Sequence, residues 1–300
     1  MAVISDNIRG ASLMVGAMTA YTVNDAFMKA ASDEIPLFQA VFFRGIGAII
    51  CLTLMCRYLN QLHFNLPRRD WGLILLRTAG ELGGTYFFLT ALFNMPIANV
   101  AAILQALPLA VALAATLFLG EALGWRRFAA IAIGFVGVVF IIQPGGADFS
   151  AYSFYALAAV VCITLRDLAV RRMSVKVPAV FIALIAAIGV TGLGAIGSLF
   201  ITWNSFSTTS VAQLGGATVF LIFGYVFSVS AMRSGEISFV APFRYTGLLV
   251  ALILGMLVFD EWPNVLTLIG ATIVVATGLF TLWRERQLRI RHNLAPDRIR

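Results

Sequence analysis

Long apolar runs, separated by short polar gaps, recur along the whole chain. Most runs hold about 18 to 25 residues, the helical length that crosses about 30 Å of hydrocarbon at about 1.5 Å per residue. Lipid offers no partner for unpaired backbone N–H and C=O groups, so such runs must be helical. The pattern predicts an all-α integral membrane protein with ten transmembrane helices, at residues 8–30, 36–57, 71–94, 96–119, 125–142, 152–173, 178–202, 211–232, 237–259 and 263–283.

The composition supports the same class of protein. Hydrophobic residues make up 60% of the 300 positions, and charged residues only 12%, about half the usual share in soluble proteins. The first run contains Asn24, Asp25 and Lys29, which indicates a retained first span rather than a cleaved signal peptide. The three cysteines lack metal-ligand spacing and are best interpreted as small packing residues.

The positions of Lys and Arg predict the orientation. If the N-terminus is cytoplasmic, sixteen of the 21 Lys and Arg residues lie in cytoplasmic segments, and only Lys29 lies on the opposite side. The net charge of +7 therefore reports topology and does not indicate a nucleic-acid partner. We expect both termini in the cytoplasm, residues 285–300 as a basic cytoplasmic tail, and the five tryptophans at the interfaces.

The second half of the chain repeats the first about 140 residues later. Ala91-Leu-Phe-Asn-Met-Pro-Ile-Ala-Asn-Val100 matches Ala231-Met-Arg-Ser-Gly-Glu-Ile-Ser-Phe-Val240, and Leu119-Gly-Glu121 matches Phe259-Asp-Glu261. With five spans in each half, the second copy must be inserted upside down. We therefore predict two inverted five-helix repeats, at residues 8–143 and 152–284, an arrangement typical of secondary transporters that bind substrate between the halves.

The starts of the two halves also correspond. Asn24-Asp-Ala-Phe-Met-Lys29 aligns with Arg166-Asp-Leu-Ala-Val-Arg171, so that Asp25 matches Asp167 and Lys29 matches Arg171.

The ten spans, the duplicated halves, and the pairs Gly120-Glu121 and Asp260-Glu261 after the fourth span of each half resemble the drug/metabolite transporter superfamily. The chain is most similar to its two-copy EamA-domain type. The resemblance implies a bacterial inner-membrane carrier that alternates access around a central cavity. Many members of the family export amino acids or related metabolites. The second copy departs from the first, because Glu236 and Phe239 replace Pro96 and Asn99, so we do not expect equivalent halves.

Ionisable residues inside the spans are the first candidates for function, because each is costly in lipid and needs a partner, water or a route to the interface. Glu81 lies near the middle of the third span, with Arg77 one turn away. It either lines the cavity and binds an ammonium group or a proton, or forms a structural ion pair with Arg77 or Arg44. Arg44 either binds a substrate carboxylate or pairs with Asp25. Arg77 and Arg166 can also reach the inner interface.

Prolines and uncharged polar residues provide further candidates. Gln105 and Pro108 lie mid-span in the fourth helix, where the proline frees a backbone carbonyl. They form either a substrate contact or hinge, or a structural kink satisfied by a neighbouring hydroxyl. Pro242 can break the ninth helix, and Arg244 follows it. As possible cavity-lining hydroxyls or rings we also name three tyrosines, Tyr86, Tyr225 and Tyr245.

Several classes of function have no support in the sequence. No phosphate-binding P-loop, His-Glu-x-x-His motif or nucleophile elbow is present, and His63 and His292 fall in predicted cytoplasmic segments. We expect no cofactor, no metal and no enzymatic activity. The partners we expect are the lipid bilayer and a small-molecule substrate, with a coupling proton as a further candidate. The leading hypothesis is a secondary transporter that exports amino acids or similar metabolites. The alternatives are a multidrug or nucleotide-derivative carrier, and a membrane enzyme or assembly protein.

Overall fold

The computed structural model describes residues 2–62, 64–120, 124–146, 149–174, 176–234 and 236–293. Within them the chain forms twelve α-helices and one 3-10 helix, and no strand. The elements are α1 (Ala2–Ala31), α2 (Leu37–Tyr58), α3 (Arg68–Asn94), α4 (Ile97–Leu104), α5 (Leu107–Leu119), α6 (Trp125–Ile142), α7 (Tyr152–Arg172), α8 (Ala179–Ser198), α9 (Thr208–Ser234), α10 (Ile237–Val240), η1 (Ala241–Tyr245), α11 (Thr246–Val258) and α12 (Val265–Asn293). The prediction of an all-helical membrane protein is confirmed. His63 and Glu121, which the sequence singled out, lie outside the described residues.

Most helices start and end within about four residues of the predicted boundaries, for identifiable local reasons. The exceptions are α1, which begins at Ala2, and α12, which continues to Asn293 into the segment predicted as a tail. Proline stands at the N-cap of α2, α3, α4 and α8, where its fixed φ suits a helix start and its missing N–H costs nothing. The span predicted to end at residue 202 stops at Ser198. There the Trp203 indole donates a hydrogen bond of 3.0 Å to the Ser198 carbonyl, one of the carbonyls that a helix end leaves unpaired.

Two of the predicted spans are interrupted rather than continuous. The fourth span divides at Gln105 and Ala106 into α4 and α5, and Pro108 follows the break. The ninth span divides into α10, η1 and α11, with Pro242 inside the 3-10 segment. The two breaks fall at matching positions of the repeat. Each proline lacks an N–H for the helical ladder. The backbone around Pro242 has 3-10 geometry, while Pro108 lies in the first turn of α5.

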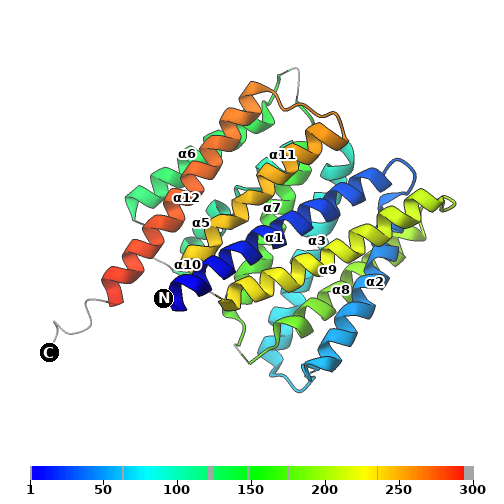
Figure 1. Ribbon diagram of the computed structural model, residues 1–300, viewed down its shortest axis with the longest axis horizontal. Helices are drawn as coiled ribbons and strands as arrows, with labels where there is room; N and C mark the ends of the chain where they lie inside the picture. Colours follow the sequence, from blue (N-terminus) through cyan, green and yellow to red (C-terminus); the bar gives the residue numbers. More distant parts are fainter. Residues whose placement is uncertain are drawn as a thin grey trace.

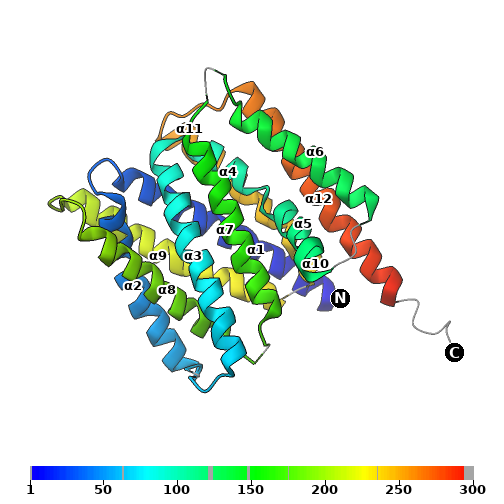
Figure 2. The same ribbon diagram turned by 180° about the vertical axis from the view of Figure 1, so that it is seen from behind.

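The helices pack in pairs across the two halves of the chain, as Figures 1 and 2 show. The closest pairs are α1 with α9, α3 with α7, α2 with α8, and α6 with α12. Exchanging each helix of the first half with its counterpart in the second converts the α1–α9 pair into the α7–α3 pair. The other two pairs exchange into themselves. This is the packing that two halves related by a two-fold axis produce.

Small residues bring several of these pairs into backbone contact. A Cβ on Gly137 of α6 would lie 2.9 Å from the Gly270 carbonyl oxygen of α12. A side chain at this position would force the two helices apart, so the α6–α12 pair depends on glycine, as close helix crossings in membranes commonly do.

Eight helical segments in the described part of the chain are long and apolar enough to span a membrane. Helices α1 and α3 have the length, at 30 and 27 residues, but carry more polar side chains. Both pack against several other helices, α1 against α9 and α11, and α3 against α7 and α8. Interior helices face protein and an internal cavity on part of their circumference, so they need not be apolar all round.

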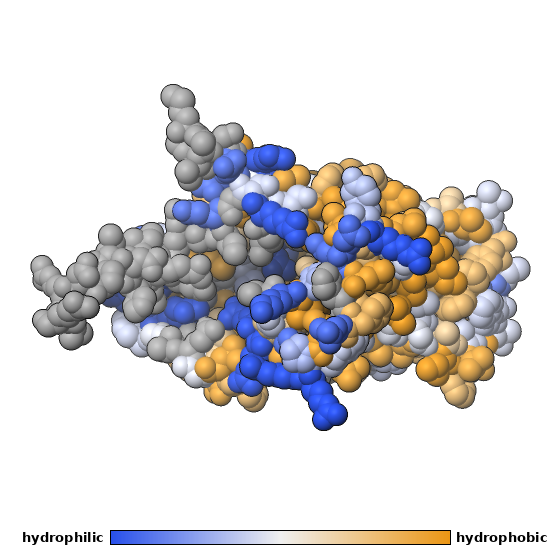
Figure 3. All heavy atoms as spheres, turned by 90° about the horizontal axis from the view of Figure 1, so that it is seen from below, coloured by the Kyte–Doolittle hydropathy of each residue, from blue (hydrophilic) through white to orange (hydrophobic). Residues whose placement is uncertain are grey.

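We call the end of the bundle where α1 stops and α2 starts the outer end, and the end where α2 stops and α3 starts the inner end. In a view from below Figure 1, hydrophilic side chains gather in and around a hollow on one part of the surface, with many hydrophobic side chains beside it (Figure 3).

Candidate functional site

A cavity of about 520 Å³ lies between the two halves of the chain. Its walls come from α1, α3, α4, α5 and α6 of the first half and from α7, η1, α11 and α12 of the second. It extends from Leu92 and Ile97, near the outer end, to Arg127 and Arg171, at the inner end. The cavity therefore follows the direction in which a solute would cross the membrane.

The two helix breaks shape the middle of this cavity. Gln105 and Pro108 line it from the α4–α5 break, and Arg244 and Tyr245 line it from η1 and its end. Gln105 and Tyr245 occupy equivalent positions in the 140-residue repeat. Broken helices of this kind place backbone polar groups inside a cavity, where they are available to a bound solute.

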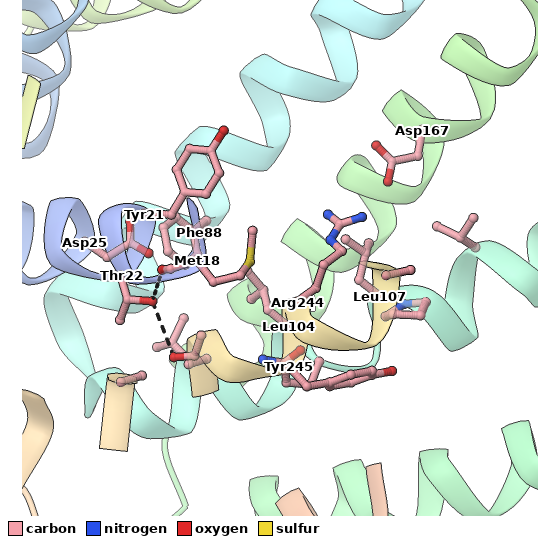
Figure 4. Close-up of a pocket in the computed structure, with 18 of the residues that line it drawn as sticks. Met18, Tyr21, Thr22, Asp25, Phe88, Leu104, Leu107, Asp167, Arg244 and Tyr245 are labelled. Atoms are coloured by element: carbon pink, nitrogen blue, oxygen red, sulfur yellow. Dashed lines mark hydrogen bonds between the residues drawn. The ribbon is translucent and has the colours of Figure 1, made fainter. Parts of the chain in front are cut away.

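Charged side chains stand at two levels of the cavity. Asp25 of α1 lies in its outer half, while Asp167 of α7 and Arg244 lie nearer its inner end. In the close-up the Arg244 side chain extends from η1 toward the side of the cavity on which Asp167 lies (Figure 4). The cavity can thus offer acidic groups at both levels and a guanidinium group at one.

The Asp25 carboxylate is held by neighbours on its own helix and on α2. Asn24 donates a hydrogen bond of 2.8 Å from Nδ2 to Asp25 Oδ1, and Arg44 donates one of 3.3 Å to Asn24 Oδ1. Arg44 is thus linked to Asp25 through Asn24, which is closer to the alternative of pairing with Asp25 than to that of a substrate contact. Nearby, the Thr22 hydroxyl donates hydrogen bonds to the Met18 carbonyl at 2.9 Å and to the Gly247 carbonyl at 3.4 Å (Figure 4). The second of these contacts ties α1 to α11 beside the cavity.

The Asp167 carboxylate is held by an ion cluster between α3 and α7. Arg166 Nε donates to Asp167 Oδ1 at 2.9 Å, and its NH1 lies 3.4 Å from Glu81 Oε2. Arg77 NH2 lies 3.2 Å from the same Glu81 oxygen. Glu81, Arg77 and Arg166 do not belong to the cavity lining, but Asp167 does. The cluster therefore fixes a cavity carboxylate from outside the cavity.

Gly80 makes this cluster possible. A Cβ at Gly80 would lie 2.8 Å from the Cys162 carbonyl oxygen and 3.0 Å from the Arg166 backbone nitrogen. Because only glycine fits, α3 and α7 approach closely enough for Glu81 to reach Arg166.

The structure brings five of the predicted residues to the cavity: Asp25, Gln105, Pro108, Arg244 and Tyr245. Five others lie elsewhere in the bundle. These are Glu81, Arg77, Arg44, Tyr86 and Tyr225. Tyr86 stacks on Phe38 with ring centroids 5.9 Å apart. Tyr225 packs against a group of buried apolar side chains that includes Phe181. Pro242 lies within η1. Their roles in transport stay predictions.

Other cavity residues were absent from the predicted set. Asp167, Tyr21, Phe88, Arg127 and Arg171 line the cavity. The repeat contained a usable signal for Asp167, because it matches Asp25, itself a candidate. Tyr21 and Phe88 carried no such signal, since single aromatics are common in membrane helices. Across the described residues, His, Cys, Asp and Glu form no group of three or more that is arranged to hold a metal ion.

Comparison with known proteins finds similarity to transporters. The EamA-like transporter family model matches residues 8–143. The S-adenosylmethionine uptake transporter of Rickettsia conorii is 24% identical over 270 residues, which cover 89% of this chain and 90% of that protein. The pseudopaline exporter CntI of Pseudomonas aeruginosa is 26% identical over 89% of this chain and 93% of its own. The riboflavin transporter of Vibrio cholerae is 25% identical over 96% of this chain and 98% of its own length.

A solved crystal structure has the same fold. It superposes with a TM-score of 0.62 at 18% sequence identity, covering 93% of this chain and 98% of that chain. The match includes nearly every element of both halves, so the arrangement of helices around the cavity has a counterpart in a crystal structure.

Proposed function

We propose that this chain is an EamA-like transporter of the drug/metabolite transporter superfamily, as its family match and its relatives support, and that it carries an amino-acid-derived metabolite through the cavity between its halves. It is a multi-pass membrane protein of a bacterial transporter family. The observation that carries the proposal is a cavity between the halves whose lining holds both carboxylates and guanidinium groups, among them Asp25, Asp167 and Arg244.

The charges of the cavity suit a solute that bears both an ammonium and a carboxylate group. Arg244 presents a planar fork of donors, which binds a carboxylate through two hydrogen bonds. Asp167, on the facing side (Figure 4), accepts hydrogen bonds from an ammonium group. We propose that these two residues bind the amino-acid end of the substrate.

The remaining space suits a larger apolar or aromatic group. A cavity of about 520 Å³ falls within the range of roughly 300–1,000 Å³ that holds drug-sized ligands. Tyr21 and Phe88 offer ring faces, and Asp25 offers a second acidic group that would favour a cationic centre. These features support a substrate larger than a simple amino acid. They are consistent with relatives that are named for S-adenosylmethionine and pseudopaline.

We propose that residues 8–143 and 152–284 act as two inverted repeats that move against each other. Cross-half helix pairs and helix breaks at matching positions support this proposal, because alternating access is commonly a rocking of one repeat against the other. The cavity reaches the inner end, where most Lys and Arg residues lie. Since this end is expected in the cytoplasm, we propose export as the direction of net transport.

A nucleotide derivative is the second candidate substrate. Arg127, Arg171 and Arg244 all line the cavity, and arginine is well suited to phosphate groups. The two candidates predict different binding residues. A phosphate group would depend on the arginines at the inner end and would make no use of Asp167.

Counterflow into proteoliposomes tests the proposal. The purified protein is reconstituted and preloaded in turn with S-adenosylmethionine, methionine, riboflavin or a nucleotide sugar. Exchange of the radiolabelled compound is then measured, with and without a proton gradient. We expect exchange of S-adenosylmethionine or methionine. Exchange of the nucleotide sugar alone would support the second candidate, and failure to exchange any of the four would contradict both.

The direction of transport needs a separate measurement. Inverted and right-side-out membrane vesicles are compared for accumulation of the compound that exchanges. Accumulation in inverted vesicles corresponds to export from the cell. Accumulation restricted to right-side-out vesicles would contradict the proposed direction.

A further inference from the structure

A charged contact joins the two halves at the outer end of the bundle. Lys29, near the end of α1, places Nζ 2.9 Å from Glu261 Oε1 in the α11–α12 loop. Lys29 also donates hydrogen bonds to the backbone carbonyls of Met95, at 2.7 Å, and Leu92, at 3.3 Å. The lysine thus holds the α3–α4 turn of the first half and the α11–α12 loop of the second at the same time.

The second oxygen of Glu261 completes the contact. Glu261 Oε2 accepts a hydrogen bond of 2.8 Å from the backbone nitrogen of Ile97, the first residue of α4. A carboxylate at a helix N-terminus satisfies an otherwise unpaired N–H and interacts favourably with the helix dipole. Phe259 lies beneath the ammonium group, 5.6 Å from Nζ to the ring centroid. Each charge therefore has more than one partner.

This contact lies directly against the cavity. Leu92 and Ile97, whose backbone atoms receive or donate these hydrogen bonds, both line the cavity and are at most 2% exposed. Asp25, one turn before Lys29, lines it as well. The Lys29 and Glu261 side chains are themselves only 12% and 19% exposed. The contact forms the layer between the cavity and the outer end.

We propose that Lys29 and Glu261 form a latch that closes the outer end of the cavity and separates when the cavity opens there. Opening the outer end requires the α11–α12 loop to move away from the α1 end and the α3–α4 turn. This movement would break the Lys29–Glu261 ion pair and the hydrogen bond from Ile97 N to Glu261 Oε2, whereas the bonds from Lys29 to Leu92 and Met95 lie within the first half. The proposal rests on the alternating-access function only for its biological role, because the closure itself can be measured without a substrate.

The repeat places a different arrangement at the inner end. Arg171 corresponds to Lys29, and Arg171 lines the cavity where it reaches the inner end. Of these two matching residues, Lys29 belongs to the contact that closes the outer end, and Arg171 belongs to the cavity wall at the inner end. This difference is expected if the two ends of the cavity open in turn.

Cysteine accessibility tests the latch. Ala101 of α4 lines the cavity. It is changed to cysteine in a protein whose native cysteines are replaced by alanine. A membrane-impermeant cationic methanethiosulfonate is added to right-side-out and to inverted vesicles, and the rate of modification is measured for Lys29→Met, Glu261→Gln and the double variant. We expect the latch variants to be modified about tenfold faster from the outer side, since charged hydrogen bonds typically contribute 1.5–3 kcal/mol. In the variant that carries both Lys29→Met and Glu261→Gln, we expect a modification rate no higher than that of the faster single variant, because both changes break the same contact.

A matched control is available at the same end. The Ser207 hydroxyl donates a hydrogen bond to Glu34 Oε2, which also joins the two halves, but neither Ser207 nor Asn204, which bonds to the Glu34 carbonyl, lines the cavity as Leu92 and Ile97 do. Glu34→Gln should leave modification of Ala101→Cys unchanged. Cys56, which is fully buried, is kept as the only cysteine in a separate set of variants. Its modification reports loss of the fold rather than opening.

The outcomes separate the latch from the transport proposal. Faster outer modification in the latch variants, with Cys56 still protected, supports the latch even if no compound of the counterflow panel exchanges. Outer modification at the parent rate in both Glu261→Gln and Lys29→Met would overturn it. So would equal acceleration by Glu34→Gln, or modification of Cys56 at the same rate as Ala101→Cys.

Discussion

At the scale of single residues, function depends on which carboxylates face the cavity and which only hold other side chains. Asp167 faces the cavity and is oriented by Arg166. Glu81 lies outside the lining and contacts Arg166 and Arg77. The two acids are therefore expected to affect transport in different ways.

Replacement of Asp167 by asparagine should weaken substrate binding strongly. The change removes a charged acceptor for the substrate ammonium group, a loss of about 1.5–3 kcal/mol, or roughly 10- to 150-fold in KM. KM is measured by counterflow with the compound that wild type exchanges. Asp70→Asn is the control, because Asp70 of α3 also contacts the second half, by accepting a hydrogen bond of 3.3 Å from Ser174 N, and lies outside the lining. An unchanged KM in Asp167→Asn would exclude the proposed ammonium contact.

Replacement of Glu81 by glutamine should raise KM less than Asp167→Asn does, because Glu81 acts on the substrate site only through Arg166. Without the Glu81 charge, Arg166 is free to pair more fully with Asp167 and to neutralise it. We expect a KM increase of about three- to tenfold with little change in maximal rate, and no further increase when Glu81→Gln is added to Arg166→Gln. Additive effects in the double variant, or complete loss of flux in a folded Glu81→Gln protein, would point instead to direct contact with substrate.

At the scale of helices, close packing between the halves positions these residues. The α3–α7 pair requires glycine at residue 80, because a Cβ there meets the backbone of α7. Backbone cannot give way as a flexible side chain can. The pair therefore links helix packing directly to the Glu81–Arg166 contact.

Replacement of Gly80 by alanine should destabilise the protein. The clash is expected to cost about 1–3 kcal/mol, as overpacking commonly does. Gly192→Ala in α8 is the matched control, because nothing lies within 4 Å of a Cβ there, and alanine in a helix interior gains about 0.5–1 kcal/mol over glycine. Thermal unfolding in detergent should rank Gly192→Ala at or above wild type and Gly80→Ala below it. A Gly80→Ala protein as stable as wild type would contradict the packing argument.

The helices themselves were largely predictable from sequence, and their partners were not. The run at residues 125–142 coincides with α6, because the length of an apolar run in lipid is set by the hydrocarbon thickness. Pro108 and Pro242 also marked the two breaks. One partner of Glu81, Arg77, is one helical turn away and was named from the sequence. The other, Arg166, could not be predicted in this way, since it is 85 positions away and only tertiary packing brings it to Glu81.

At the scale of the whole molecule, the duplication explains the architecture, while the cavity combines unlike residues. Asp25 and Asp167 occupy matching positions of the repeat and both line the cavity. Gln105 and Tyr245 also match in position but differ in chemistry. The repeat therefore predicted where cavity residues lie better than it predicted their identity.

The orientation of the molecule is a prediction at this scale. The distribution of Lys and Arg places both termini in the cytoplasm. A C-terminal green fluorescent protein should fluoresce, and a C-terminal alkaline phosphatase should be inactive. An active phosphatase with a dark fluorescent protein would reverse the orientation and, with it, the proposed direction of transport.

The most direct test of the account fills the cavity without touching its charges. Ala112 lines the cavity, whereas Ala129 lines a groove between α6 and α12 on the outside of the bundle. Counterflow by purified Ala112→Phe and Ala129→Phe is compared with wild type in proteoliposomes, using the compound that wild type exchanges. The account predicts that Ala129→Phe exchanges at close to the wild-type rate and that folded Ala112→Phe loses at least about 90% of the exchange, because the ring occupies the space the solute needs. Exchange by Ala112→Phe at the wild-type rate would show that the solute does not pass through this cavity.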